Sequence, residues 1–323
     1  MQHTLQVQFK KPTTVKNMVR DLYHFDRPLC LFRIVLLAAM LSGCDRSAPP
    51  ATFSVMTYNL HQYALMDRDG GGEDDDPKPE SEQKAVLSLI AKERPDMLAV
   101  QEMGDEIIFG QFREALRSAG LNYPYAELLR RGTIEANLAV LSRFPIVSVQ
   151  HHTNDWYSIG PAKVPVARGF LDVTIQVNPD YQFRLLSAHL KSKVFSPLGQ
   201  TEMRRNEARL LNKNVRTILK ENPEVNLLVV GDMNDDYQSA ALREVAGRRG
   251  GELTDLRPLD SMGDVWTCFR DYLDEYSRLD YLFVSEGMLP EVVKGKTRVV
   301  RDPLTVQASD HRPVIGVFQA LEK

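Results

Sequence analysis

The stretch at 227–235, Leu-Leu-Val-Val-Gly-Asp-Met-Asn-Asp, joins an apolar run to a polar end. Four consecutive apolar residues are typical of a buried strand, and the glycine marks its end. Asp232 and Asn234 are two residues apart, so on a continuing strand their side chains face the same side. Asp232 could accept a proton from water while Asn234 fixes its orientation. An Asx turn or a helix cap is the alternative interpretation.

Similar strand patterns recur on both sides of this stretch. They lie at 53–59, 97–101, 138–141, 169–177, 183–189, 226–230, 279–284 and 314–318. Helical patterns separate several of them, at 81–94, 105–119, 202–220 and 239–246. The order strand, helix, strand, helix and then many strands predicts an α/β (α+β) protein with mixed β-sheets covered by helices.

Composition and charge exclude several classes of protein. The chain has 323 residues, of which 43% are hydrophobic and 26% charged, so it can build a sizeable core and is not a disordered chain. It has no apolar run of roughly 18–20 residues, which excludes a multi-span membrane protein. Its net charge is −3, which argues against binding nucleic acid by bulk positive charge. Three cysteines without CxxC or Cys/His zinc spacing exclude a disulfide framework, and we interpret Cys268 as a small buried residue.

The N-terminal segment has the organisation of an export signal. A basic region precedes a short apolar core, 34–41, which ends at Leu41-Ser42-Gly43-Cys44. This ending resembles the bacterial lipoprotein signal, in which the cysteine is lipidated. The resemblance implies a signal peptide at 1–43, a linker at 44–52 after lipidated Cys44, and a protein anchored in the bacterial cell envelope, periplasmic or on the outer surface. A buried amphipathic helix with an incidental cysteine is the alternative, and Met18 is an alternative start.

Polar residues that could take part in catalysis or binding also lie at the ends of other predicted strands. Asn59 ends the first strand, and Glu102 follows the second, where a carboxylate suits a hard cation such as Mg²⁺. His189 and Lys191 follow the strand at 183–189 and could contact a phosphate. A turn residue, an exposed helix-start glutamate and a structural histidine are the respective alternatives.

An aspartate also lies inside an apolar strand. Asp280, in Arg-Leu-Asp-Tyr-Leu-Phe at 278–283, needs a partner if it is buried. His311 could donate one ring N–H to Asp280 while its other nitrogen faces the site. A satisfied core pair is the alternative.

Taken together, these motifs are more specific than any one of them. In chain order they read YNLH, QE, LSRFP, HLKS, GDMND, RLDYLF and SDHRPV. The set resembles the endonuclease/exonuclease/phosphatase family, whose members share the DNase I-like fold, over about residues 53–318. The resemblance implies a domain at 53–320 built as a four-layer sandwich, with two packed mixed β-sheets flanked by helices. It also implies cleavage of phosphoester bonds by water with Mg²⁺ or Mn²⁺.

The resemblance assigns roles residue by residue. Glu102, Asp310 and Asn59 match the metal-binding positions, and Asn59 also matches a substrate-contacting one. The residues matching catalytic positions are His189, Asp232, Asn234, Asp280 and His311. Lys191, Arg143 and Arg168 could add positive charge for the phosphate, although Arg143 could equally support the sheet. One residue departs from the pattern: His61 stands where many family nucleases have Asp or Asn, which leaves a second metal open.

Several substrates are compatible with these motifs. The leading hypothesis is an exported nuclease or nucleotide phosphodiesterase, with DNA or RNA among its substrates. HLKS followed by a basic helix (Arg204, Arg205, Arg209, Lys213) resembles secreted bacterial DNases of the family. The alternatives are a phosphoesterase for phospholipid, sphingomyelin or inositol phosphate, although no membrane-inserting hairpin is recognisable, and a catalytically silent binding module. We expect a monomer.

Overall fold

The computed structural model describes residues 51–131, 136–247 and 251–321, and these described residues form one compact unit. Two six-stranded sheets lie at its centre. The first has the order β15 (Arg298–Val299), β16 (Val314–Gln319), β1 (Thr52–Tyr63), β2 (Met97–Met103), β4 (Asn137–Ser142), β3 (Tyr125–Leu129). The second has the order β11 (Thr254–Asp255), β14 (Asp280–Val284), β10 (Leu227–Asp232), β9 (Tyr181–His189), β8 (Phe170–Asn178), β5 (Ile146–Val149).

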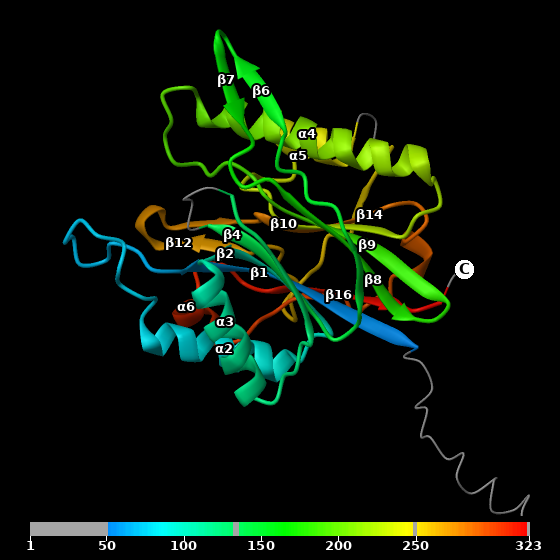
Figure 1. The fold of residues 1–323 in the computed structure, drawn as a ribbon, viewed down its shortest axis with the longest axis horizontal. Coiled ribbons are helices and arrows are strands. Elements are labelled where there is room, and N and C mark those ends of the chain that lie inside the picture. Colours follow the sequence, from blue (N-terminus) through cyan, green and yellow to red (C-terminus); the bar gives the residue numbers. More distant parts are fainter. Residues whose placement is uncertain (1–50, 132–135, 248–250, 322–323) are drawn as a thin grey trace, which may run out of the picture. The chain divides into compact units, whose positions relative to one another are not determined.

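Helices cover the outer face of each sheet, as Figure 1 shows. The first sheet is covered by α2 (Glu80–Glu93), α3 (Glu106–Ser118) and α6 (Thr305–Ala308). The second is covered by α4 (Gln200–Glu221) and α5 (Ala240–Ala246). Both sheets are mixed, since β1 is parallel to β2 but antiparallel to β16, and β10 is parallel to β9 but antiparallel to β14. The predicted four-layer sandwich is confirmed.

The two-residue periodicity of the strands separates the layers of the core. In β10, Leu228 and Val230 face the layer between the sheets, whereas Leu227 and Val229 face α4 and α5. The same alternation holds in β1, where Phe53 joins the layer between the sheets and Met56 joins the layer beneath α2 and α3. Central strands such as β1 and β10 thus pack apolar side chains on both faces, which explains their nearly continuous apolar sequences.

All eight predicted strands and all four predicted helices are present, with no boundary shifted by more than four residues. Shorter elements were not predicted, because a few residues carry little periodicity. These are the edge strands β3, β5, β11 and β15, the hairpins β6 (Trp156–Ile159)–β7 (Ala162–Pro165) and β12 (Cys268–Arg270)–β13 (Glu275–Ser277), the helix α6, and the 3₁₀ turns η2 (Asp271–Leu273) and η3 (Leu289–Glu291).

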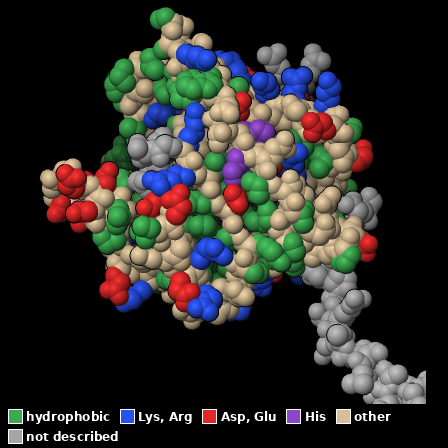
Figure 2. Space-filling view, in the orientation of Figure 1, with side chains coloured by type: hydrophobic (Ala, Val, Ile, Leu, Met, Phe, Trp, Pro, Cys, Tyr) green, Lys and Arg blue, Asp and Glu red, His purple; other side chains and the backbone are tan. Residues whose placement is uncertain are grey.

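Two features lie outside the four layers. The acidic segment between β1 and α2 projects from the body, and Figure 2 shows its carboxylates gathered at the tip. The proposed signal peptide 1–43, Cys44 and most of the linker lie outside the described residues. Among the residues that are described, no helix is both long and apolar enough to cross a membrane.

Gly231 allows β10 to pass close to its neighbour. Its φ is +130°, and a Cβ at this position would lie 1.9 Å from the carbonyl oxygen of Ala188 on β9. Gly231→Ala should therefore lower the free energy of unfolding by about 2 kcal/mol or more, because the contact is with backbone that cannot move aside. Urea denaturation measures this change. Gly110→Ala is the control: a Cβ there meets nothing within 4 Å, and alanine in α3 should be neutral or stabilising. Equal stability of both variants would contradict this prediction.

Candidate active site

The polar residues of the candidate site come together where the layer between the sheets ends. Asp232 pairs in register with His189 on β9 and with Asp280 on β14, so three ionisable side chains lie side by side. Continuing the alternation of each strand, they follow the apolar residues of the layer between the sheets. Asn59 reaches across from the first sheet, and its amide donates to Asp232 Oδ2 at 3.0 Å.

Asp232 is buried and holds a dense set of contacts. Its Oδ1 accepts from the backbone N–H of Asn234 at 2.8 Å, which is the Asx turn that the sequence left as an alternative. Its Oδ2 accepts from the amides of Asn59 at 3.0 Å and of Asn234 at 3.2 Å. Burial raises the pKa of Asp232 to about 7, although the nearby His311 opposes the shift. A carboxylate in this state can exchange a proton near neutral pH.

His311 forms a buried pair with Asp280. Its Nδ1 lies 2.7 Å from Asp280 Oδ2, and its Nε2 lies 3.8 Å from Asp232 Oδ2. Burial alone would lower the pKa of His311, but the carboxylates of Asp280 and Asp232 outweigh it and raise the pKa well above its usual value. The backbone N–H of Asp280 donates to Thr267 Oγ1 at 3.0 Å, which helps to hold this strand end in place. The geometry therefore favours a cationic His311 with a fixed ring orientation.

His189 titrates in the opposite direction. Its Nε2 lies 3.4 Å from Asp232 Oδ2 and 3.8 Å from Glu102 Oε1. Burial lowers its pKa well below the usual value, and the positive charge of Arg168 adds to the shift, as do His311 and Lys191. These shifts favour a neutral His189 beside a cationic His311. The neutral His189 can donate a hydrogen bond, and the cationic His311 can stabilise negative charge.

Glu102 is held in a strained backbone conformation at the end of β2. Its φ is +61°, in the left-handed region that a glutamate rarely adopts. One carboxylate oxygen accepts from the Asn59 amide at 3.1 Å, and the other accepts from the backbone N–H of Gln62 at 2.8 Å. His61 and Gln62 also have positive φ, and the backbone N–H of His61 donates to Asn59 Oδ1 at 3.0 Å. Backbone strain of this kind gathers at functional sites.

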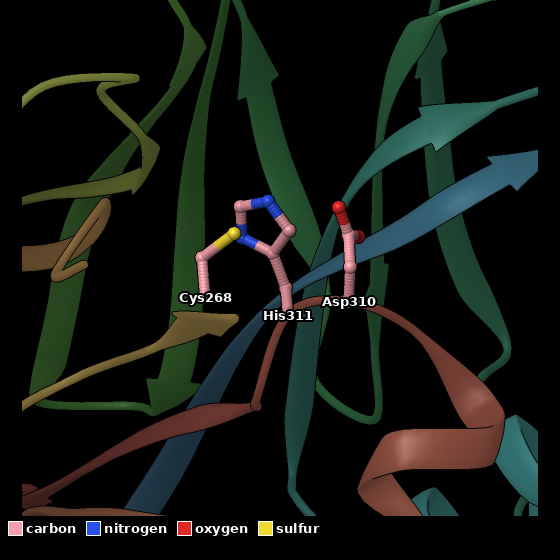
Figure 3. Close-up of side chains that lie close together, drawn as sticks. All are labelled: Cys268, Asp310 and His311. Carbon is pink, nitrogen blue, oxygen red and sulfur yellow. The ribbon is translucent and has the colours of Figure 1, made fainter. Parts of the chain in front are cut away.

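Asp310 and His61 form the solvent-facing side of the cluster. Their side chains are 36% and 48% exposed, and His61 Nδ1 lies 3.9 Å from Asp310 Oδ1. Figure 3 shows Asp310 on one side of the His311 imidazole and Cys268 on the other, with potential ligand atoms of all three within 4.8 Å of one another. Cys268 is buried, as the sequence predicted, and burial raises the pKa of its thiol, which favours the protonated form.

The residues present fit a divalent cation. Glu102, Asp310 and Asn59 offer carboxylate and amide oxygens, which are the ligands that hard cations prefer. Asp232, Asp280 and His311 form a second group whose ligand atoms lie within 4.8 Å of one another. Asp280 Oδ1 is buried without a hydrogen-bond partner among the described residues, so the site retains acceptor capacity.

Lys191 lies near the cluster, but Arg143 does not. Lys191 follows His189 by two residues, and its charge contributes to the lowered pKa of His189. Arg143 follows β4, which runs antiparallel to β2, and it pairs at 3.2 Å with Asp96 at the opposite end of β2 from Glu102. Six residues of strand, roughly 20 Å, separate the two ends. The structure therefore assigns Arg143 the sheet-supporting place that the sequence left as an alternative.

The basic residues of α4, which in the sequence resembled those of secreted DNases, are largely neutralised by ion pairs within the protein. Arg204 is 3% exposed and donates to Asp235 and to the carbonyl oxygens of Lys191 and Ser192. Arg205 and Arg209 both pair with Glu244 of α5. Glu207, also buried, accepts from the backbone N–H of Lys191 at 2.6 Å. Sequence reasoning missed the positioning roles of Arg204 and Glu207, whose only signal was their spacing on the inner side of α4.

This fold and site place the chain in a known class of phosphoester hydrolases. The sequence profile described as the Endonuclease/Exonuclease/phosphatase family matches residues 56–311, and the chain belongs to this family. The matched range contains every residue of the cluster from Asn59 to His311. No protein of curated function matches the sequence significantly.

Solved structures share the fold at low sequence identity. The human Nocturnin catalytic domain with bound sulfate is 19% identical, with a TM-score of 0.62, covering 84% of this chain and 95% of its own. Truncated Caenorhabditis elegans TDP2 is 19% identical, with a TM-score of 0.58 and coverage of 83% and 98%. Sphingomyelinase C from Streptomyces griseocarneus is 18% identical, with a TM-score of 0.56 and coverage of 84% and 100%. These likenesses establish the fold, and their range of names leaves the substrate to be argued from the site.

Proposed function

We propose that the protein is a metal-dependent phosphodiesterase that acts as an exported nuclease or nucleotide phosphodiesterase. The observation that carries this proposal is the buried arrangement of Asp232 between His189 and His311. One group that exchanges a proton near neutral pH lies between a neutral and a cationic imidazole. Such a set suits attack of water on an anionic phosphodiester, where a proton must be taken up and negative charge must be stabilised.

The metal has a defined place in this proposal. Glu102 and Asp310 would hold Mg²⁺ or Mn²⁺, with Asn59 beside them. When bound, the ion would neutralise phosphate charge and stabilise the leaving oxygen. Because Asn59 donates to both Glu102 and Asp232, the same side chain fixes the metal-binding carboxylate and the proton acceptor relative to each other.

The chain's own residues supply the remaining functions. Asp232 accepts the proton of the attacking water, and the amide of Asn234 holds its carboxylate in position. His311, oriented by Asp280, and His189 face the phosphate oxygens. Arg168 and Lys191 add positive charge beside His189. Asp280 is therefore a positioning residue, whereas Asp232, His189 and His311 act on the reacting groups.

Nicking of supercoiled plasmid tests the nuclease proposal. Purified full-length chain with Mg²⁺ or Mn²⁺ should convert supercoiled plasmid to the open circular form, and EDTA should stop the reaction. An Asp232→Asn, His311→Ala double variant controls for contaminating nucleases. Folded protein that leaves both plasmid and short dinucleotides intact under these conditions would contradict a nuclease or nucleotide phosphodiesterase.

The requirement for metal should depend on Glu102. In Glu102→Gln, loss of the carboxylate charge should raise the Mn²⁺ concentration for half-maximal activity at least roughly tenfold, while saturating metal restores much of the rate. The matched control is Glu106→Gln on α3, whose side chain is 67% exposed and pairs with Arg130. An unchanged metal requirement in Glu102→Gln would remove Glu102 from the metal site.

A phosphoesterase for phospholipid or sphingomyelin is a second candidate. The sequence analysis recognised no membrane-inserting hairpin, but β12–β13 carries exposed Tyr272 and Leu273 at its turn, 77% and 53% accessible. An exposed apolar turn near the site is what contact with a lipid surface needs. Release of phosphocholine from sphingomyelin vesicles, without nuclease activity, would favour this candidate.

Anchoring at the cell envelope completes the proposal. Lipidation of Cys44 after removal of 1–43 would tether the enzyme to a bacterial membrane, facing the periplasm or the exterior. The order of basic region, apolar core and Leu-Ser-Gly-Cys supports it. Fractionation of cells that express Cys44→Ser tests it: the variant should leave the membrane fraction, and unchanged membrane association would overturn the anchor.

A further inference from the structure

An aromatic pocket of about 380 Å³ adjoins the catalytic cluster. It is lined by residues of the β12–β13 hairpin and α6, and its walls combine Asp310 and His61 of the site with three aromatic rings. Asp310 has a carboxylate oxygen within 4.8 Å of a ring nitrogen of His311. A substrate whose phosphate lies against His311 can therefore place one of its two substituents in this pocket.

The rings of the pocket form a continuous wall. Phe269 and Tyr276 are stacked with centroids 4.4 Å apart, and Tyr276 meets Trp266 edge-to-face at 4.8 Å. Phe269 and Trp266 are half-buried, whereas Tyr276 is 57% exposed. Exposed aromatic surface of this kind beside a reaction centre offers a stacking platform for a planar ring.

The wall is held rigidly from behind. The guanidinium of Arg312 lies 4.1 Å from the centroid of the Trp266 ring and donates to the Trp266 carbonyl at 3.2 Å. Arg312 is itself buried and donates to Asp260 Oδ2 at 2.7 Å. Because Arg312 directly follows His311 in the chain, the same turn positions the catalytic imidazole and the aromatic wall. A ring held in place in this way lowers the ordering cost of binding.

We infer that this pocket binds the nucleobase on one side of the scissile phosphate, and this inference rests on the proposed phosphodiesterase function. A volume of about 380 Å³ lies within the range of small-ligand pockets and suits one nucleoside. Glu82, Asp271 and Asp310 line it, so it disfavours a second phosphate, and its three aromatic rings favour a planar group. Gln307 brings an amide that can hydrogen-bond the edge of a base. Because the rings pack on one another, they form a wall and not the open cage that a choline ammonium requires.

Dinucleotides that lack one base test whether a nucleobase of the substrate occupies the pocket. The substrates are thymidylyl-thymidine and its two analogues in which an abasic tetrahydrofuran replaces either nucleoside. In the wild type, kcat/KM should fall about tenfold for one analogue and much less for the other, since one stacked base contributes this order of binding. Glycerophosphocholine serves as the choline diester, and a preference for it over all three dinucleotides would overturn the inference.

Two variants test whether the aromatic wall of the pocket is what recognises the base. Phe269→Ala and Tyr276→Ala should each lower kcat/KM for thymidylyl-thymidine about fivefold to tenfold, mainly through KM, and leave the sensitive abasic analogue unchanged. Tyr272→Ala is the matched control, since Tyr272 belongs to the same hairpin, is 77% exposed and does not line the pocket. Equal losses on all three dinucleotides, or no loss in either variant, would overturn the pocket while leaving the phosphodiesterase function intact.

A binding measurement separates failure of the pocket from failure of the proposed function. Trp266 is one of two tryptophans, so in a Trp156→Phe background its fluorescence reports on the pocket. Thymidine 5′-monophosphate should quench it saturably, and ribose 5-phosphate should not. Quenching by a protein that hydrolyses no dinucleotide would overturn the phosphodiesterase and retain the base pocket. Absence of quenching from an active enzyme would overturn the pocket alone.

Discussion

Replacing Asp232 by Asn should lower kcat roughly 10³-fold, with little change in KM. The carboxylate is buried, its pKa is raised to about 7, and it lies within 3.4 Å of His189 and 3.8 Å of His311. Asparagine keeps the shape but cannot take up the proton of the attacking water. Its amide group would also face the amide donors of Asn59 and Asn234, which now converge on Oδ2. Steady-state kinetics with a dinucleotide and saturating Mn²⁺ measure the change.

The control for Asp232 is its neighbour Asp236. This carboxylate is 51% exposed and pairs with Lys193, so Asp236→Asn should retain nearly the full rate. Far-ultraviolet circular dichroism and urea midpoints establish that both variants are folded. Loss of less than a factor of ten in Asp232→Asn, at saturating metal and substrate, would exclude Asp232 as the proton acceptor.

Removing the charge of Asp280 should lower kcat about 10²-fold or more at neutral pH, although Asp280 does not contact the phosphate. Its Oδ2 lies 2.7 Å from His311 Nδ1 and is a main reason that the pKa of this histidine is raised. In Asp280→Asn the pKa of His311 falls, so the cation is lost as pH rises through the lowered pKa. Activity should therefore recover in part at lower pH, where His311 is protonated again, because loss of the Asp280 charge also removes one cause of the raised pKa of Asp232 and so favours its ionised form.

The pH profile distinguishes positioning from a structural defect. In the wild type, the cationic form persists to a pH well above the usual histidine value because of Asp280 and Asp232. A shift of the basic limb of kcat toward lower pH in Asp280→Asn supports the pair. A uniform loss at all pH values in folded protein would mean that Asp280 does not act through the protonation of His311.

The sequence predicted the fold because the strands are buried on both faces. Strands such as β9 and β10 pack against the opposite sheet on one face and against helices on the other. Their sequences are therefore nearly continuous apolar runs, which are easily recognised as strands. Edge strands such as β3 and β5 are half-exposed and carry a weak signal. The hairpin β12–β13 was missed because its strands are three residues long and only partly buried, so their hydrophobic periodicity is weak.

The sequence also predicted most of the cluster, for a reason of geometry. Parallel strands end at the same edge of a sheet, so Asn59 and His189 could be expected beside the residues that end the strands next to them. The sequence could not predict how loops and side chains from distant parts of the chain pack against each other. Tertiary contacts determine three such features: the left-handed backbone at Glu102, the position of Arg143 away from the site, and the burial of Arg204.

The most direct test is hydrolysis of a minimal diester whose cleavage needs no particular base or lipid. Full-length chain and its Asp232→Asn, His311→Ala variant are assayed on bis(p-nitrophenyl) phosphate, with Mn²⁺ and with EDTA. The account predicts metal-dependent release of p-nitrophenol by the wild type, abolished in the folded variant and by EDTA. Release that survives in the variant, or folded wild-type protein that is inactive with every divalent ion, would contradict a metal-dependent phosphodiesterase centred on Asp232 and His311.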